Sequence, residues 1–122
     1  MTKVIIVDNS KDACRIYEDT LTCAGYNVQS ICEEEKALET IKKEHPDLVL
    51  LDMLMPKISG MHLLDRILSD KDNKKTRVVI LTNLTDSKIA TEAIGHGARD
   101  YLIKTEVGMS ELLKRIDRAL ST

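Results

Sequence analysis

Three short runs of consecutive aliphatic residues constrain the fold of this chain more than any other feature. They lie at residues 4–7, 48–51 and 78–81. Uninterrupted apolar runs of this length, rich in β-branched side chains, are typical of strands that are buried on both faces of a parallel sheet. Two weaker strands are predicted at about 27–31 and 100–103.

Segments with helical spacing of apolar residues separate these strands. The predicted helices span about 11–24, 33–44, 60–69, 87–96 and 110–121. Gly25 and Gly97 follow two of them as C-caps, His45-Pro46 ends the second, and Asp86 or Ser87 starts the fourth. The order predicts an α/β fold: one doubly wound, five-stranded parallel sheet with five helices. We expect a single domain over 1–122, with a solvated loop at 69–76.

Composition excludes several classes of function. The formal net charge of −2 excludes a general electrostatic nucleic-acid binder, which needs a basic face. The chain has no Trp or Phe, which argues against platforms for base stacking. No apolar run approaches the roughly 18–20 residues of a membrane span, and the N-terminus does not resemble a signal peptide. We therefore expect a cytoplasmic protein with no membrane partner.

The cysteines and histidines do not form a recognisable site in the sequence. Cys14, Cys23 and Cys32 are odd in number and lack the spacing of a zinc site, so we expect reduced thiols that are buried or half-buried. The three histidines are scattered among polar neighbours, and we expect no metal or catalytic role for them.

Polar residues instead follow four of the predicted strands. Asp8-Asn9, Asp52, Thr82-Asn83 and Lys104 stand where these strands end. In an open α/β sheet such ends meet at one edge, where sites form. An oxygen-rich cluster there suits Mg²⁺, and an Asp at its centre can act as a nucleophile that forms an acyl phosphate. A lysine and a hydroxyl can hold phosphoryl oxygens, so the set indicates phosphoryl transfer.

The whole chain resembles the response-regulator receiver domains of two-component signalling. The matching segments are 4–9, 46–56 with Gly60, 79–82 and 97–104. Several motifs spread over the chain make a stronger signal than any single short pattern. The resemblance implies a flavodoxin-like (βα)5 fold and a chemotaxis-regulator-like single receiver that acts as a phosphorylation-dependent switch. It implies a protein that is not an enzyme and has at most weak intrinsic phosphatase activity.

The resemblance also implies roles for individual residues. Asp52 would accept a phosphoryl group from a sensor histidine kinase or a phosphotransfer protein. Asp8, Asn9, Asp52 and the backbone carbonyl of Leu54 would bind Mg²⁺. Thr82 and Lys104 would bind the phosphoryl group. Thr82 and Tyr101 would form the switch, which is read by an output protein or a fused output domain on the face made by the fourth helix, the fifth strand and the fifth helix.

The sequence departs from the family at four positions. Asn9 stands where a second acidic residue is usual, which lowers the expected affinity for the metal. Thr105 replaces the usual proline after Lys104, and a cis bond without proline costs about 3–4 kcal/mol, so we expect a trans bond there. Leu54 and Leu84 stand where polar residues often modulate hydrolysis, which predicts a long-lived phosphorylated state.

Other functions fit less well. A pseudo-receiver that binds a partner without phosphorylation is the main alternative, and Asn9 is its only support. An aspartyl-phosphate hydrolase usually has a second Asp two residues after the nucleophile, where this chain has Leu54. A flavin carrier is also a poor fit, because this chain lacks a phosphate-binding turn after the first strand. A stand-alone receiver and a receiver cut from a longer regulator both fit.

Overall fold

The computed structural model describes residues 1–73 and 75–121, in which strands and helices alternate along the chain. The strands are β1 (Lys3–Val7), β2 (Asn27–Ile31), β3 (Leu48–Leu51), β4 (Arg77–Thr82) and β5 (Asp100–Ile103). The helices are α1 (Lys11–Cys23), α2 (Ala37–Glu44), α3 (Gly60–Ser69), α4 (Ser87–Gly95) and α5 (Met109–Leu120). Two short 3-10 turns, η1 (Glu34–Lys36) and η2 (Lys71–Asn73), precede α2 and β4.

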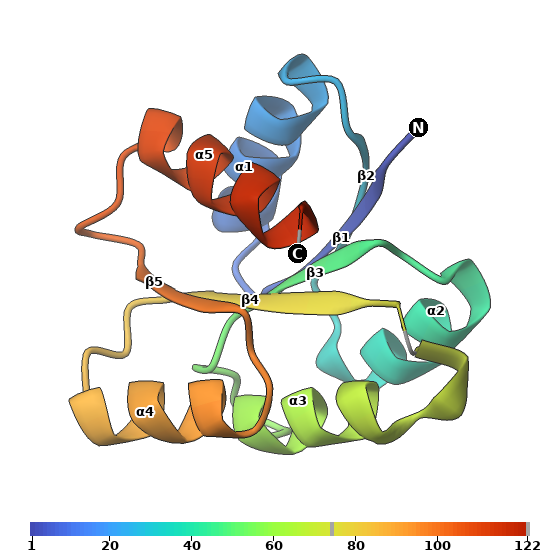
Figure 1. Cartoon of the computed structure of the whole chain (residues 1–122), viewed down its shortest axis with the longest axis vertical. Helices are drawn as coiled ribbons and strands as arrows, with labels where there is room; N and C mark the ends of the chain where they lie inside the picture. The colour runs from blue at the N-terminus through green and yellow to red at the C-terminus, as the bar shows by residue number, and fades with distance from the viewer. Residues whose placement is uncertain (74, 122) are drawn as a thin grey trace.

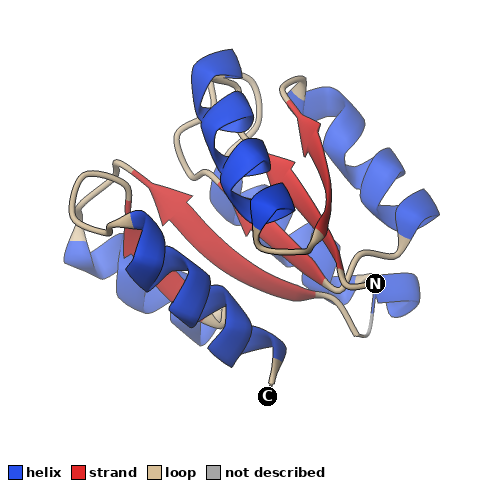
Figure 2. Cartoon of the chain, turned by 90° about the horizontal axis from the view of Figure 1, so that it is seen from above, coloured by secondary structure: helices blue, strands red, loops and turns tan. Residues whose placement is uncertain are grey.

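The five strands form one parallel sheet in the order β2-β1-β3-β4-β5. Figure 1 shows α1 and α5 on one side of this sheet and α2, α3 and α4 on the other. The view from above shows the same three layers (Figure 2). The predicted fold class, with its five strands and five helices, is therefore confirmed.

Each face of the sheet has its own aliphatic core, because successive side chains of a strand point to opposite faces. On β1, Ile5 and Val7 pack into the core beneath α2, α3 and α4. Val4 and Ile6 pack into the core beneath α1 and α5. The predicted burial of the aliphatic runs on both faces is confirmed.

Most predicted helix ends agree with the structure. Gly25 and Gly97 have φ values of 98° and 115° after α1 and α4, in the left-handed region that favours glycine. His45 ends α2 with a φ of 48°. Of the two candidates for the N-cap of α4, Asp86 is the one observed, since its carboxylate accepts a hydrogen bond from the backbone N–H of Lys88 at 2.9 Å.

The predicted start of the second helix was wrong. The α-helix begins at Ala37 rather than at 33, after the 3-10 turn η1. The cause is Glu34, whose side chain turns into the protein and accepts hydrogen bonds from the backbone of a distant loop. In a regular α-helix that starts at 33, the helix geometry would set the direction of the Glu34 side chain, rather than its bonds to that loop.

The predicted solvated loop at 69–76 was also wrong in part. Asn73 and Thr76 are buried. The Asn73 amide donates to the carbonyl of Ile67 at 3.2 Å, and the Thr76 hydroxyl donates to the carbonyl of Pro46 at 2.8 Å. These bonds fix the entry to β4. Lys74, which belongs to the same predicted loop, lies outside the described residues.

All three cysteines are free thiols. Cys14 is buried and Cys32 half-buried, as expected, but Cys23 is exposed at the end of α1. Among residues 1–73 and 75–121, no helix is both long and apolar enough to cross a membrane.

Candidate functional site

The carboxyl ends of the strands bring four of the predicted site residues together. Asp8 follows β1, Asp52 follows β3, Thr82 ends β4 and Lys104 follows β5. Backbone hydrogen bonds extend the sheet into the site: Asp52 donates to the carbonyl of Val7 at 3.0 Å, and Lys104 donates to that of Thr82 at 2.8 Å. The positions of these side chains therefore rest on the sheet itself.

Lys104 joins the two carboxylates of the site. Its Nζ lies 2.5 Å from Oδ2 of Asp8 and 3.2 Å from Oδ2 of Asp52. Both carboxylates are buried, and the lysine side chain is 13% exposed. Burial by itself lowers the pKa of Lys104, but the hydrogen bond and the charge of Asp8, together with Asp52, outweigh it and raise the pKa. The ammonium group therefore offsets part of the negative charge of the two carboxylates.

The second oxygen of each carboxylate also accepts hydrogen bonds. Oδ1 of Asp52 accepts from the Thr82 hydroxyl at 2.6 Å and from the backbone N–H of Leu54 at 3.0 Å. Oδ1 of Asp8 accepts from the backbone N–H of Ser10 at 2.9 Å. Asp52 is thus oriented by a lysine, a hydroxyl and a backbone amide at once.

A chain of hydrogen bonds leads from Asp52 to Tyr101 on β5. The Thr82 hydroxyl, which donates to Asp52, accepts from the backbone N–H of Leu84 at 3.3 Å. The carbonyl of the same Leu84 accepts from the Tyr101 hydroxyl at 2.8 Å. Tyr101 is half-buried, and its burial, followed by the negative charges of Asp52 and Asp86, raises the pKa of its phenol. Thr82 and Tyr101, predicted as a pair, are therefore connected through one backbone unit.

The structure places the remaining predicted residues at the rim of the site. The side chain of Asn9 is exposed, and that of Leu54 is 49% exposed. Leu84 is half-buried and packs against the core beneath α3 and α4. In the described residues all peptide bonds are trans, so the bond from Lys104 to Thr105 is trans, as predicted.

The donor set fits a magnesium ion in its chemistry. Mg²⁺ is bound in proteins by one or two carboxylates and other oxygens, and it keeps several waters. Asp8 and Asp52 supply two buried carboxylates, and Asn9 and the carbonyl of Leu54, the other predicted ligands, offer neutral oxygens. Within the described part of the chain, no group of three or more His, Cys, Asp or Glu is placed to hold a metal ion, so a larger anionic site is not formed.

The sequence analysis missed Glu34, which holds the loop after β3. Glu34 is 4% exposed, and its carboxylate accepts from the backbone N–H of Lys57 at 3.1 Å and of Ile58 at 2.6 Å. This loop begins at Asp52 and includes Leu54, whose backbone N–H bonds the Asp52 carboxylate. Glu34 lies between two other glutamates, and nothing in the sequence distinguishes the one that turns inward.

Gly60 lets α3 start directly against the site. A Cβ at this position would lie 2.5 Å from the Cα of Met53 and 3.0 Å from the carbonyl oxygen of Asp52. Any side chain would push the helix away from the end of β3. Gly60 is one of the residues that match the family in the sequence, and this close approach explains why a glycine stands there.

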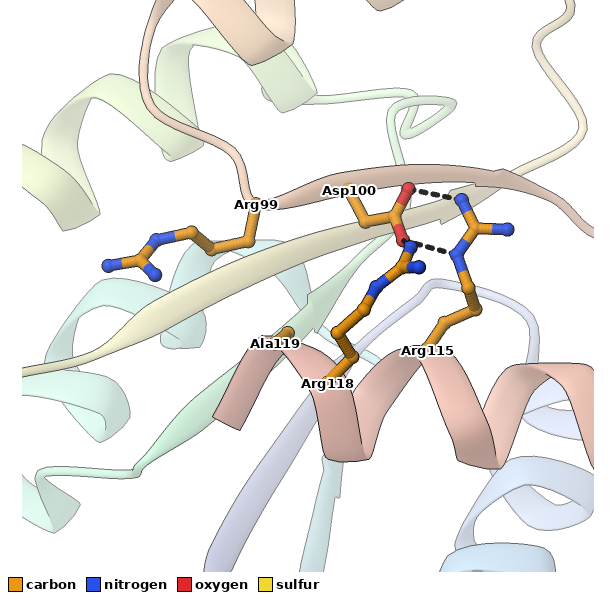
Figure 3. A pocket seen from close by; sticks show the side chains of 5 residues that line it. All are labelled: Arg99, Asp100, Arg115, Arg118 and Ala119. Carbon is orange, nitrogen blue, oxygen red and sulfur yellow. Dashed lines mark hydrogen bonds and ion pairs between the residues drawn. The ribbon is translucent and has the colours of Figure 1, made fainter. Parts of the chain in front are cut away.

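A separate small pocket lies at the other end of β5 (Figure 3). Its volume is about 140 Å³, and Arg99, Asp100, Arg115, Arg118 and Ala119 line it. Arg115 donates to both oxygens of Asp100 at 2.6 Å. Burial raises the pKa of Asp100, but hydrogen bonds from Arg115 and from the backbone of Tyr101 outweigh it and lower the pKa. The ion pair fastens α5 to β5 and lies away from Asp52.

Residues 4–117 match the model of the response regulator receiver domain. The chain therefore belongs to this family, whose members are the receiver domains of response regulators in two-component systems. The match covers Asp8, Asp52, Thr82 and Lys104 and all strands except the first residue of β1.

Individual relatives agree with this assignment. A probable transcriptional regulator, ycf27 of Porphyridium aerugineum, is 33% identical over 98% of this chain and 51% of its own length. The chain spans about half the length of the curated relatives it matches. Among solved structures, the chemotaxis protein CheY4 of Vibrio cholerae has a TM-score of 0.89 at 28% identity, with 98% of both chains covered. The BeF3-activated receiver domain of Klebsiella pneumoniae RstA has a TM-score of 0.90 at 26% identity, covering 99% of this chain and 100% of that one.

Proposed function

We propose that residues 1–122 form one receiver domain that acts in the cytoplasm and accepts a phosphoryl group on Asp52 from a sensor histidine kinase or a phosphotransfer protein. The observation that carries this proposal is the setting of Asp52 at the end of the central strand β3. Its two oxygens accept from Lys104 and Thr82 separately, at 3.2 Å and 2.6 Å. Those are the two side chains that a phosphoryl group on Asp52 needs as partners.

In the proposed reaction an Asp52 oxygen attacks the phosphorus of a phosphohistidine. The P–N bond breaks, the imidazole leaves with its electron pair, and an acyl phosphate forms on Asp52. Lys104 balances the charge of one phosphoryl oxygen, and Thr82 donates a hydrogen bond to another. Phosphoryl transfer depends mostly on such positioning and charge neutralisation, so a site with few residues is sufficient. Any intrinsic phosphatase activity would be weak.

Asp8, Asn9, Asp52 and the backbone carbonyl of Leu54 would hold Mg²⁺ in this function. When bound, the ion neutralises the charge that develops on the phosphoryl oxygens. Asp8 and Lys104 keep the site organised around Asp52, because each already contacts the other. Asn9 contributes an oxygen without a charge.

Thr82 and Tyr101 would carry the signal from Asp52 to a partner. A phosphoryl group on Asp52 competes for the Thr82 hydroxyl, which in turn accepts from the backbone that also bonds Tyr101. The face made by α4, β5 and α5 would then present the change to an output protein or a fused output domain. We expect no direct nucleic-acid binding by residues 1–122 themselves.

Labelling with a small phosphodonor such as acetyl phosphate tests the proposal. We expect the wild type to gain one phosphoryl group in the presence of Mg²⁺, and Asp52→Asn to gain none, because an amide cannot form the acyl phosphate. Asp19→Asn, on the exposed surface of α1, is the matched control and is expected to label normally. Circular dichroism checks that both variants are folded.

Full labelling of Asp52→Asn would show that another residue is the acceptor. A wild type that labels neither with nor without Mg²⁺, and that does not bind the BeF3 used to activate the RstA receiver, would favour a pseudo-receiver instead. The observation that favours this second candidate is Asn9, which leaves the site one negative charge short beside a lysine that already pairs with both carboxylates.

A further inference from the structure

Two cysteine thiols face each other beside the site. Cys14 lies in the first half of α1 and Cys32 directly follows β2, 18 residues later. Their sulfur atoms are 3.1 Å apart. Cys14 is 3% exposed, Cys32 is half-buried, and the third cysteine, Cys23, is exposed at the far end of α1.

The geometry favours a bond between the two sulfurs. A disulfide is about 2.0 Å long, and cysteines whose side chains point apart cannot form one without moving the backbone. Here the side chains already point at each other, so about 1 Å of approach is enough. Helix α1 packs on β2 and keeps both residues in place.

We propose that Cys14 and Cys32 form a modification site that takes a low-molecular-weight disulfide, such as glutathione disulfide, and closes into an intramolecular disulfide. In the first step the Cys32 sulfur attacks one sulfur of the reagent, and one glutathione leaves as a thiol after taking up the Cys32 proton. In the second step the Cys14 sulfur gives up its proton and attacks the Cys32 sulfur, the bond from Cys32 to glutathione breaks, and the second glutathione leaves as a thiol after taking up a proton. Two protein thiols are oxidised, and one reagent disulfide is reduced to two thiols.

The surroundings of the two sulfurs give the order of these steps. Cys14 is 3% exposed, so a reagent in solution does not reach its sulfur directly. Cys32 is the half-exposed member of the pair and is the one that a reagent in solution reaches first. Cys14 then acts as the resolving thiol from inside the fold.

The pair is connected to the candidate phosphorylation site. The Cys14 thiol donates to the backbone carbonyl of Asp8 at 3.1 Å, and the Asp8 carboxylate pairs with Lys104. A disulfide removes the hydrogen on the Cys14 sulfur and therefore this bond. Oxidation of the pair would thus remove a hydrogen bond that holds the backbone of Asp8.

The test uses the folded Cys23→Ser protein, which retains only the proposed pair. After incubation with excess glutathione disulfide, we expect a monomer that has lost two hydrogen atoms in mass and has no thiol left to alkylate. Peptide mapping should find Cys14 linked to Cys32. Adding Cys14→Ser should stop the reaction at a glutathione adduct on Cys32, and adding Cys32→Ser instead should leave Cys14 unmodified.

Two free thiols in the folded Cys23→Ser protein after this treatment would overturn the proposal, as would a stable glutathione adduct or a disulfide between two chains. These readouts do not depend on phosphorylation. The connection to Asp8 rests on the proposed function and is tested separately, by the labelling rates of oxidised and reduced Cys23→Ser protein. The loss of one hydrogen bond predicts a change of at least about twofold, and equal rates would overturn that connection.

Discussion

Lys104 offsets one of the two negative charges of the buried carboxylates, so these three side chains together keep one negative charge. The lysine contacts Oδ2 of both Asp8 and Asp52. A third carboxylate at residue 9 would add another negative charge for a cation to neutralise, whereas Asn9 adds none. At the scale of single residues, we therefore expect residue 9 to influence the affinity for metal.

We expect Asn9→Asp to bind Mg²⁺ more tightly than the wild type. Two charges a few ångströms apart interact by about 4 kcal/mol at an effective dielectric of 20, and desolvation offsets most of this, which leaves about a tenfold gain in affinity. Calorimetric titration of both proteins with MgCl₂ measures the difference. Asn9→Ser, which adds no charge, is the control, and equal affinities for Asn9→Asp and the wild type would show that residue 9 does not contribute to the site.

Leu54 and Leu84 set the expected lifetime of the acyl phosphate. Hydrolysis needs a water placed in line with the phosphorus, and neither side chain can position it by hydrogen bonding. We expect a Leu54→Asn, Leu84→Glu double variant to lose its phosphoryl group at least about tenfold faster than the wild type, since positioning and proton transfer are each worth orders of magnitude in rate. The measurement is the decay of label after the donor is removed.

The matched control for this experiment is a Leu54→Met, Leu84→Met variant, which keeps both positions apolar and should decay like the wild type. If the wild type decays as fast as the polar variant, the two leucines do not determine the lifetime.

Side chains at the strand ends could be predicted from the sequence because a polar residue directly after a buried apolar run is easy to recognise. Asp8, Asp52, Thr82 and Lys104 were all found this way, and the structure brings them into contact. The assignment of each carboxylate oxygen to its donor could not be predicted, because it depends on rotamers. The thiol pair of Cys14 and Cys32 was missed for a similar reason: its members come from different elements and only the packing of α1 on β2 brings them together.

At the scale of elements, Glu34 ties the segment after β2 to the loop after β3. Its buried carboxylate accepts from two backbone N–H groups in that loop. We expect Glu34→Gln to lower the free energy of unfolding by about 1–3 kcal/mol, because the new amide group faces donors that then lack an acceptor. We also expect weaker Mg²⁺ binding, since Leu54 belongs to the same loop.

Urea denaturation and magnesium titration measure these two effects. Glu35→Gln is the matched control: Glu35 is exposed and lies 3.7 Å from the ammonium group of Lys57, a surface pair whose loss costs less than about 1 kcal/mol. If Glu34→Gln weakened stability but left metal affinity equal to that of the control, Glu34 would have a purely structural role.

The boundaries of elements were predictable where local chemistry decides them. Gly25, His45 and Asp86 all stand at helix ends that their own backbone preferences and side chains explain. The start of α2 and the segment before β4 were predicted wrongly, because Glu34 and Thr76 bond to residues that are remote in the sequence and Asn73 bonds back to α3. The spacing of apolar residues in the sequence does not indicate these hydrogen-bond partners.

At the scale of the whole molecule, one ion pair joins two of the helices that cover the same face of the sheet. His96 follows α4, and its Nδ1 lies 2.5 Å from a carboxylate oxygen of Asp65 in α3. The hydrogen bond to Asp65 raises the pKa of His96, with smaller contributions from the charges of Asp65 and Glu92. The protonated histidine therefore stabilises the folded molecule at low pH.

The stabilisation is fully present below the pKa of the unfolded chain, near 6.5, and is lost as the pH rises through the higher pKa of the folded protein. We expect the difference in unfolding free energy between the wild type and Asp65→Asn to shrink as the pH rises through this range. Urea denaturation at a series of pH values measures it, and the His96 resonance followed by NMR gives the pKa directly. A His96 pKa that is the same in wild type and Asp65→Asn would contradict the expectation.

The three apolar runs predicted the parallel sheet and its two covered faces. Consecutive aliphatic residues are typical of a strand that is buried on both sides. The apolar runs do not indicate the order of the strands in the sheet, which is β2-β1-β3-β4-β5. It makes β1 and β3 neighbours, which is why Asp8 and Asp52 lie close enough to share one lysine.

The link between Thr82 and Tyr101 passes through the main chain of residue 84 and not through its side chain. Every amino acid except proline offers the same N–H and carbonyl at that position. Under the proposed function, a change of the side chain at residue 84 would alter the lifetime of the signal while these main-chain hydrogen bonds stay in place. We therefore expect persistence and transmission to be adjustable independently at this one position.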